Sequence, residues 1–168
     1  MKSILAIIFT SILFGCASSN VTVRVPPPIP ATTPNTVKVQ VNDLRAPGVA
    51  ASTREAAFGV PMGNVTFDPP EKQLVKDALD AVLSRQTPVK SNELYTCDII
   101  EFGVNTKTTP LYWDVVGVVH LKLRHDGREQ DLSGTHSERT YLWPGENIIG
   151  RVMQESLRKA VEGAQASP

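Results

Sequence analysis

Hydrophobic and polar positions alternate along this chain with two distinct periods, which predict four strands and two helices. Valines recur at every second position over residues 37–45, the pattern of a half-buried strand, and another strand is expected over 94–104. Apolar residues spaced by three and four over 71–85 and 146–161 predict two helices, each with one apolar face. The two remaining strands belong to a hairpin that precedes the last helix.

The hairpin is centred on Asp126-Gly127, the residue pair favoured in two-residue type I′ turns. If His125 faces Arg128, one face of the hairpin becomes polar, and residues of opposite charge or aromatic character lie across from each other on it. These cross-strand partners are Arg124 and Glu129, Lys122 and Asp131, Asp114 and Arg139, and Tyr112 and Tyr141. The opposite face is the expected core face and carries Trp113, Val115, Val119, Leu121, Leu123 and Leu132.

Two polar residues conflict with this register, because His136 and Glu138 would point toward the core face. We therefore expect a β-bulge near Gly134 that turns the second strand of the hairpin. The elements follow the order strand, long connection, helix, three strands, helix. This order predicts an α+β fold, in which two helices pack on one face of a mainly antiparallel four-stranded sheet.

The connection between the first strand and the first helix, residues 46–67, is long for a compact domain. Connections of this length are usually functional or mobile, and the apolar residues of this one either cover the core or dock on a partner. Its candidate contact residues are Phe58, Val60 and Met62. The following Asp68-Pro69-Pro70-Glu71 predicts a helix start, with Asp68 as the N-cap and Glu71 completing a capping box.

The first sixteen residues have the pattern of an export signal that ends in a lipid anchor. One lysine precedes an apolar run over residues 4–14, which is too short to span a membrane, and Leu13-Phe14-Gly15-Cys16 has the form of a bacterial lipoprotein signal. We expect residues 1–15 to be removed and Cys16 to carry a diacylglycerol and an amide-linked chain, which together make anchoring durable. Because Ala17 follows the cysteine, the outer membrane, facing the periplasm, is the expected location.

The rest of the chain divides into a tether and one domain. Residues 16–36 are rich in proline and small polar residues, which favours an extended tether over a packed core. Within it, residues 21–25 alternate like a strand, so pairing with a sheet edge stays open as an alternative. Residues 37–163 are expected to form a single globular domain, and 164–168 a disordered tail.

Charge and cysteine content narrow the function classes. Seventeen basic and seventeen acidic residues give a formal net charge of zero, and the sequence has no basic stripe that would attract nucleic acid. We therefore expect no nucleic-acid partner. With Cys16 acylated, Cys97 has no disulfide partner, and its neighbours predict a small buried hydrophobe. His136 with Glu138 and Cys97 offers neither the ligand number nor the geometry that zinc prefers. We therefore expect no cofactor, no metal and no catalysis.

Several features together resemble one family. These are the lipoprotein signal, the short strand before the prolines, the strand Val37–Val41 running into Asn42-Asp43-Leu44-Arg45, the Phe58–Gly63 segment, and the order of helices and strands. Over residues 37–162 the chain resembles the YajG-type family of small uncharacterised lipoproteins. More remotely, it is similar to PelC-like envelope lipoproteins and to the amino-terminal domain of TolB. The resemblance implies an accessory role in the envelope without known catalysis, and it carries over no functional residues.

Two function hypotheses follow. The first is a lipid-anchored, non-catalytic accessory or scaffold protein that contacts an envelope protein, or a second copy of itself, through the long connection or a sheet edge. Val116 and Val118 favour it, because they are apolar residues in the middle of a polar face. The second is a periplasmic module that binds glycan or another small ligand. It would gain support if a groove were lined by Tyr112, Trp113, Tyr141 and Trp143, whose expected role is otherwise packing.

Overall fold

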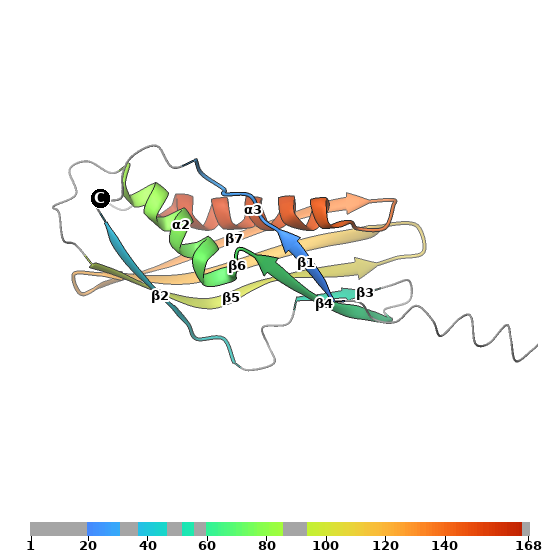
Figure 1. Ribbon diagram of the computed structural model, residues 1–168, viewed down its shortest axis with the longest axis horizontal. Helices are drawn as coiled ribbons and strands as arrows, with labels where there is room; N and C mark the ends of the chain where they lie inside the picture. The colour runs from blue at the N-terminus through green and yellow to red at the C-terminus, as the bar shows by residue number, and fades with distance from the viewer. Residues whose placement is uncertain (1–19, 31–36, 47–51, 56–59, 86–93, 166–168) are drawn as a thin grey trace, which may run out of the picture.

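The computed structural model describes residues 20–30, 37–46, 52–55, 60–85 and 94–165. These residues form one sheet, two α-helices and a short 3-10 helix (Figure 1). The elements are β1 (Val21–Arg24), β2 (Lys38–Asp43), β3 (Ser52–Glu55), β4 (Pro61–Asp68), α2 (Glu71–Leu83), β5 (Leu94–Thr108), β6 (Trp113–His125), β7 (Arg128–Thr140), α3 (Glu146–Glu162) and η2 (Gly163–Gln165).

The sheet has seven strands and is mixed. Its main path runs β1-β4-β3-β5-β6-β7, and β2 pairs with β5 beside that path. Strands β5, β6 and β7 are antiparallel, as are β3 and β4, whereas the pairs β1–β4, β2–β5 and β3–β5 are parallel. The α+β class and the packing of both helices on the sheet are confirmed. The expectation of four mainly antiparallel strands is wrong, because β1, β3 and β4 extend the sheet beyond the four expected strands and three of its pairings are parallel.

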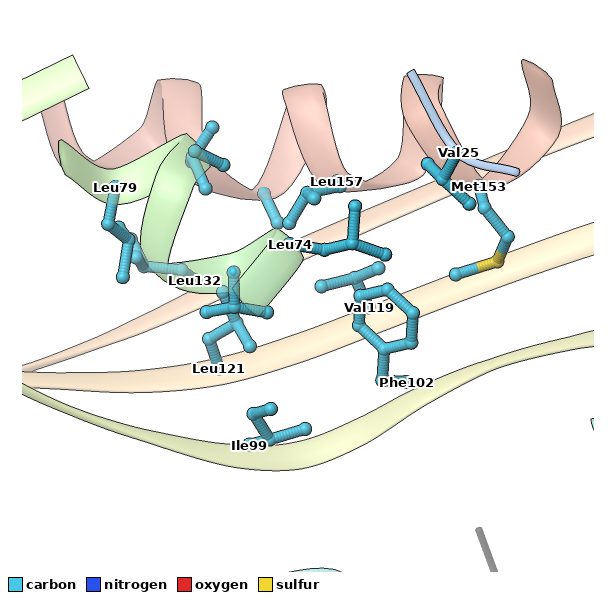
Figure 2. Packing of buried hydrophobic residues seen from close by; sticks show 14 of the residues in the cluster. Val25, Leu74, Leu79, Ile99, Phe102, Val119, Leu121, Leu132, Met153 and Leu157 are labelled. Carbon is cyan, nitrogen blue, oxygen red and sulfur yellow. The ribbon is translucent and has the colours of Figure 1, made fainter. Parts of the chain in front are cut away.

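Both helices lie on the same side of the sheet, and α3 covers most of it (Figure 1). Helix α3 contacts β6 and β7 at one edge of the sheet and β1 at the other, so the sheet curves around this helix. Figure 2 shows the resulting core, in which Leu74 and Leu79 of α2 and Leu157 of α3 meet Phe102 of β5 and Leu121 of β6. These side chains are buried and form one continuous cluster.

Glycines allow the closest approach of α3 to the strands. A Cβ atom on Gly134 of β7 would lie 2.0 Å from the carbonyl oxygen of Ser156 and 2.5 Å from the backbone nitrogen of Ala160. A Cβ on Gly150 of α3 would lie 2.6 Å from the carbonyl oxygen of Arg24 in β1. No other residue fits where two backbones approach this closely.

The hairpin register is confirmed, and the expected bulge near Gly134 is wrong. Pairing runs without interruption from His125–Arg128 to Trp113–Thr140. The polar side chains need no bulge because α3 supplies partners for them. Arg151 donates to Glu138 at 2.6 Å and lowers the pKa of that carboxyl, and the Nζ of Lys159 lies 3.5 Å from Nδ1 of His136.

A bulge does occur in β5, between Ile99 and Glu101, and it divides this strand into two segments. The first segment pairs with β2 and the second with β3, on the same edge of β5. Arg45 bridges the interval between them, because its guanidinium donates to the carbonyl oxygen of Phe102 at 3.0 Å and forms ion pairs with Asp43 at 2.6 Å and Glu71 at 3.5 Å. The Asn42–Arg45 segment therefore closes an edge of the sheet that would otherwise lack partners.

Parts of the predicted tether and of the predicted tail belong to the folded domain. Strand β1 pairs with β4, and Val23, Val25 and Ile29 are buried in the core, so residues 20–30 belong to the folded domain. The alternative of sheet pairing for residues 21–25 is therefore the observed arrangement. At the other end Ala164 lies in η2 and is buried. Residues 1–19, 31–36 and 166–168, which include the expected signal segment, lie outside the described part of the chain.

The long connection predicted over residues 46–67 contains β3 and most of β4, and it contributes Val65 and Phe67 to the core. The predicted capping by Asp68 is wrong. Asp68 is the last residue of β4, its carbonyl oxygen accepts a hydrogen bond from the nitrogen of Val25, and Pro70 occupies the N-cap position without a side-chain bond. The helix also ends at Leu83, two residues before the predicted limit.

Candidate contact surfaces

The residues predicted to make contacts fall into three places. Cys16 and Phe58 lie outside the described residues. Val60, directly before β4, is exposed, and Met62 within β4 is half-buried. Val116 and Val118 are half-buried on the outer face of β6, the face turned away from the helices. The structure therefore does not gather these residues into a single site.

The outer face around Val116 and Val118 carries small side chains with an ion pair on either side. Val118 pairs with Gly103 of β5 and Thr135 of β7, and Val116 with Asn105 and Ser137. One flanking ion pair joins Arg139 to Asp114 at 2.8 Å, as the register predicted. Toward the turn, the charged residues pair with diagonal neighbours on the adjacent strand and not with the directly facing residues that the register predicted. Lys122 pairs with Glu129 at 2.9 Å, His120 lies 3.3 Å from Asp131, and Arg124 pairs with Asp98.

Strand β7 forms one edge of the sheet. Its thirteen residues pair with β6, and no other strand of the described residues pairs with its second edge. The Nζ of Lys159 donates to the carbonyl oxygen of Thr135 at 3.0 Å, so this carbonyl points away from β6. Lys159 therefore occupies one acceptor of this edge, whereas backbone groups of an edge strand that have no partner are available to another strand.

A cluster of exposed apolar side chains lies at one end of the sheet, and we call it the apolar end. It consists of Val60 (55% exposed), Leu111 (77%), Tyr141 (72%), Leu142 (78%) and Trp143 (39%). Within the described ranges these are five of the eight large hydrophobic side chains that are exposed, the others being Leu44, Leu94 and Ile100. Single exposed apolar residues are ordinary, but a group at one place marks a contact surface.

Strand direction shows that these residues share one end. Strand β1 is parallel to β4, β4 is antiparallel to β3, and β3 is parallel to β5, so β4 starts where β5 finishes, and β1 starts beside Val65, four residues further along β4. Because β5, β6 and β7 are successive antiparallel strands, β6 starts and β7 finishes at that end too. It is the right-hand end in Figure 1 and carries the β5–β6 turn, the β7–α3 connection and the start of β4, which Val60 precedes.

Aromatic packing holds the apolar end in place. The rings of Trp113 and Trp143 meet edge to face at 6.0 Å, and the guanidinium of the buried Arg54 lies over Trp143 at 5.9 Å. Tyr112 and Tyr141 form a second edge-to-face pair at 6.3 Å. Trp113 starts β6 and Tyr112 directly precedes it, and the other residue of each pair follows β7. The exposed rings of Tyr141 and Trp143 are therefore presented by a fixed support.

The same support contains a cation. The guanidinium of Arg139 lies 3.7 Å from the centre of the Tyr112 ring and is paired with Asp114. In the turn below, the nitrogen of Thr109 donates to the carbonyl oxygen of Tyr112 at 2.9 Å. The position of Leu111 is thus fixed by a closed turn.

Leu111 and Leu142 are exposed apolar residues that the sequence analysis did not single out, and Tyr141 and Trp143 were expected to pack. A signal was present in the run Tyr141-Leu142-Trp143. Three consecutive large apolar residues cannot all face the core of a two-sided sheet, so at least one must be exposed. The flanking prolines, Pro110 and Pro144, indicated that both apolar runs lie at connections.

The remaining reactive group, Cys97, and its acidic neighbour Asp98 are buried within the fold. Cys97 is buried, and burial raises the pKa of its thiol to about 12, so the thiol stays protonated. Asp98 is also buried and accepts from Asn42 at 3.0 Å and from Arg124. In the described part of the chain, no three histidine, cysteine or acidic side chains are grouped so that they could bind a metal ion. The helices of these ranges include none with the length and apolar character needed to cross a membrane.

Comparisons with known proteins give no family assignment. No family model matches the chain, and no curated protein matches it. One similar solved structure is described as that of an uncharacterised protein. It is 13% identical, the alignment covers 89% of this chain and 97% of that one, and the TM-score is 0.48. A similarity at this level carries no argument about function.

Proposed function

We propose that this chain is a lipid-anchored accessory protein of the bacterial envelope, held on the periplasmic face of the outer membrane, which acts through contacts with another protein and not through catalysis. The observation that supports protein contact is the second edge of the thirteen-residue strand β7, with which no other described strand pairs, although Lys159 occupies the carbonyl oxygen of Thr135 there. A partner strand can pair with such an edge through its backbone, and side chains on the adjoining face then select the partner.

The adjoining face suits such a contact. Val116 and Val118 are bordered on β7 by Thr135 and Ser137, whose short side chains leave the strands accessible. The Asp114–Arg139 pair at one end and the Lys122–Glu129 pair at the other supply charges of both signs. A partner must match these charges, and they also discourage unspecific pairing along the edge.

Labelling with a fatty-acid analogue tests the anchor. The proposal expects label on the wild-type protein and on Cys97→Ser, and none on Cys16→Ser. Cys97 is a matched control because it is the other cysteine of the chain, and its buried, protonated thiol is a poor nucleophile. Label that survives Cys16→Ser contradicts the anchor.

A photo-crosslinking residue placed in β7 tests the contact. At Ser137, which is exposed beside Val116, the proposal expects one discrete protein adduct in cells, dependent on Cys16. The control position is Gln73, which is exposed on α2, on the other side of the sheet. Equal adducts at both positions, or no adduct at Ser137 in membrane-bound protein, would contradict a contact through β7.

One observation favours a second function, a module that binds glycan or another small ligand. The rings of Tyr141 and Trp143 are exposed, and an exposed ring can stack on a sugar face. The chain has two tryptophans, Trp113 and Trp143, and both belong to the apolar end or its support, so tryptophan fluorescence reports on this region alone. A saturable change in emission on titration with soluble envelope oligosaccharides would support this second function.

A further inference from the structure

The proposed lipid anchor can reach the end of the sheet that carries the apolar end. Asn20 precedes β1 and lies beside Asn64, level with Thr53 and Asn105, three residues before β5 finishes at Thr108. Four residue steps separate Asn20 from Cys16. A chain spans at most about 3.5 Å per residue, so the anchor lies within about 14 Å of Asn20. Three residues of strand, about 10 Å, separate the level of Asn20 from the end of β5, so this length of chain is enough for a lipid on Cys16 to lie level with the apolar end.

The side chains at this end are those that proteins place at a membrane interface. Tryptophan and tyrosine are enriched at the level of the lipid headgroups, and leucine gains from leaving water. Leu111 and Leu142 are the two most exposed large apolar residues in the described part of the chain, and Tyr141 and Trp143 adjoin Leu142. All four lie on connections at the end of the sheet.

Two of the arginines near these residues have partners within the protein, whereas Lys107 and Glu146 are exposed. Arg139 is paired with Asp114 and lies over Tyr112, and the buried Arg54 lies over the ring of Trp143. The opposite end of the hairpin differs, because its turn presents two exposed charged residues, Asp126 and Arg128. The two ends of the same strands thus have opposite character.

We propose that the apolar end, formed by Val60, Leu111, Tyr141, Leu142 and Trp143, inserts into the interfacial layer of the lipid bilayer that carries the Cys16 anchor. This inference rests on the proposed function, since it takes the anchor at Cys16 as given. The insertion holds the strands pointing at the bilayer, leaves the edge of β7 accessible from the side, and adds a second membrane contact to the lipid chains.

Quenching of tryptophan emission by brominated lipid tests this inference. The full chain, with its native lipid, is reconstituted in vesicles of phosphatidylethanolamine and phosphatidylglycerol whose acyl chains are either ordinary or brominated. For rings at the depth of an interfacial helix, about 5–10 Å into the headgroup and acyl boundary, we expect about a twofold loss of emission in brominated vesicles. Trp143→Phe is expected to remove most of the quenching, because Trp113 lies beneath Trp143.

Two double variants separate insertion from simple proximity. Leu111→Ser with Leu142→Ser is expected to abolish quenching, while flotation with the vesicles and the melting temperature stay at wild-type values. The matched control is Leu44→Ser with Leu94→Ser, which removes two leucines that are 61% and 55% exposed and lie outside the apolar end. This control is expected to keep full quenching.

The outcomes distinguish the inference from the proposed function. Protein that floats with the vesicles but shows equal emission in both lipids overturns insertion and leaves the anchor standing. Protein that fails to float overturns both. Quenching that survives the Leu111 and Leu142 substitutions, or a change in emission caused by soluble oligosaccharide and not by brominated lipid, overturns insertion and assigns the apolar end to another ligand.

Discussion

The sheet region beneath α3 and the apolar end contain the same kinds of side chain in opposite surroundings. Beneath α3, Val119, Leu121 and Leu132 are buried, and Gly134 allows the helix backbone to touch the strand. At the apolar end, Leu111 and Leu142 are more than three-quarters exposed. The first region supplies the burial that folding requires, whereas the second contributes little to it. Exposure at the apolar end therefore calls for an explanation outside the fold.

The covered region is the more sensitive to change, and Gly134→Ala is expected to have the largest effect. The new Cβ would lie 2.0 Å from a backbone oxygen of α3, and a backbone cannot turn aside as a side chain can. We expect a loss of about 3 kcal/mol in the free energy of unfolding, or about 10 °C in melting temperature. The control is Gly145→Ala, where a Cβ meets nothing within 4 Å, and its expected loss is under about 1 kcal/mol. Equal losses would refute the close approach of α3.

The second-largest loss of stability is expected at the edge of β5 that Arg45 closes. Arg45→Ala removes the hydrogen bond to Phe102 and leaves Asp43 and Glu71 without their cation. Because the Arg45 side chain is only 6% exposed, we expect a loss of about 2 kcal/mol, measured by urea unfolding. Arg128→Ala, at an exposed position of the turn, is the control and should change stability by less than about 0.5 kcal/mol. A loss no greater than the control's would show that the Arg45 bridge does not stabilise the sheet.

The pH dependence of the unfolding free energy provides a further test of the same edge. The hydrogen bond from Arg45 lowers the pKa of Asp43 below its ordinary 3.8. Its contribution to stability is therefore complete above about pH 4 and is lost as the pH falls through the lowered folded value. The difference in unfolding free energy between wild type and Asp43→Asn should be largest near neutral pH and should narrow below about pH 4. In an Arg45→Ala background the difference should no longer depend on pH in this way.

The apolar end should tolerate change that the covered region does not. Leu111→Ser with Leu142→Ser is expected to shift the melting temperature by less than about 2 °C, because exposed substitutions rarely change stability by more than about 0.5 kcal/mol. Differential scanning calorimetry measures this directly. A fall comparable to that of Gly134→Ala would mean that these leucines complete the core, and the contrast between the two regions would disappear.

The smallest expected effect concerns the ion pair between Asp114 and Arg139. Reversing both charges, with Asp114→Lys and Arg139→Glu, should restore part of the stability that Asp114→Lys loses alone. The two residues face each other across β6 and β7, and the side chain of Arg139 is half exposed, so the coupling is weak. A double-mutant cycle at low and high salt measures it. Coupling that does not weaken with salt would mean that another contact joins the two positions.

The hairpin could be predicted from the sequence because its determinants are local. Asp126-Gly127 fixes the turn, both residues have positive φ, and every pair of the register follows from it. The bulge expected near Gly134 was wrong because its partner is distant. The polar residues that suggested it find Arg151 and Lys159 on α3, thirteen or more positions further along the chain.

The added strands could be predicted only in part, for the same reason. The alternation over residues 21–25 left β1 open as an alternative to the tether that the neighbouring prolines favour, and β3, with four residues, is too short for a periodic pattern. Each is stabilised by pairing with distant residues, β1 with β4 and β3 with both β4 and β5. The apolar end was missed because Tyr141 and Trp143 do pack, edge to face, and yet stay exposed.

The contact between β1 and α3 has a consequence for the timing of folding. The nearest approach joins Arg24, close to the start of the domain, to Gly150, close to its end. Contacts between residues so far apart in sequence form late, since the whole intervening chain must first be ordered. The core therefore cannot be completed until the last helix has emerged from the ribosome. Until then the valines of β1 lack the helix surface that buries them.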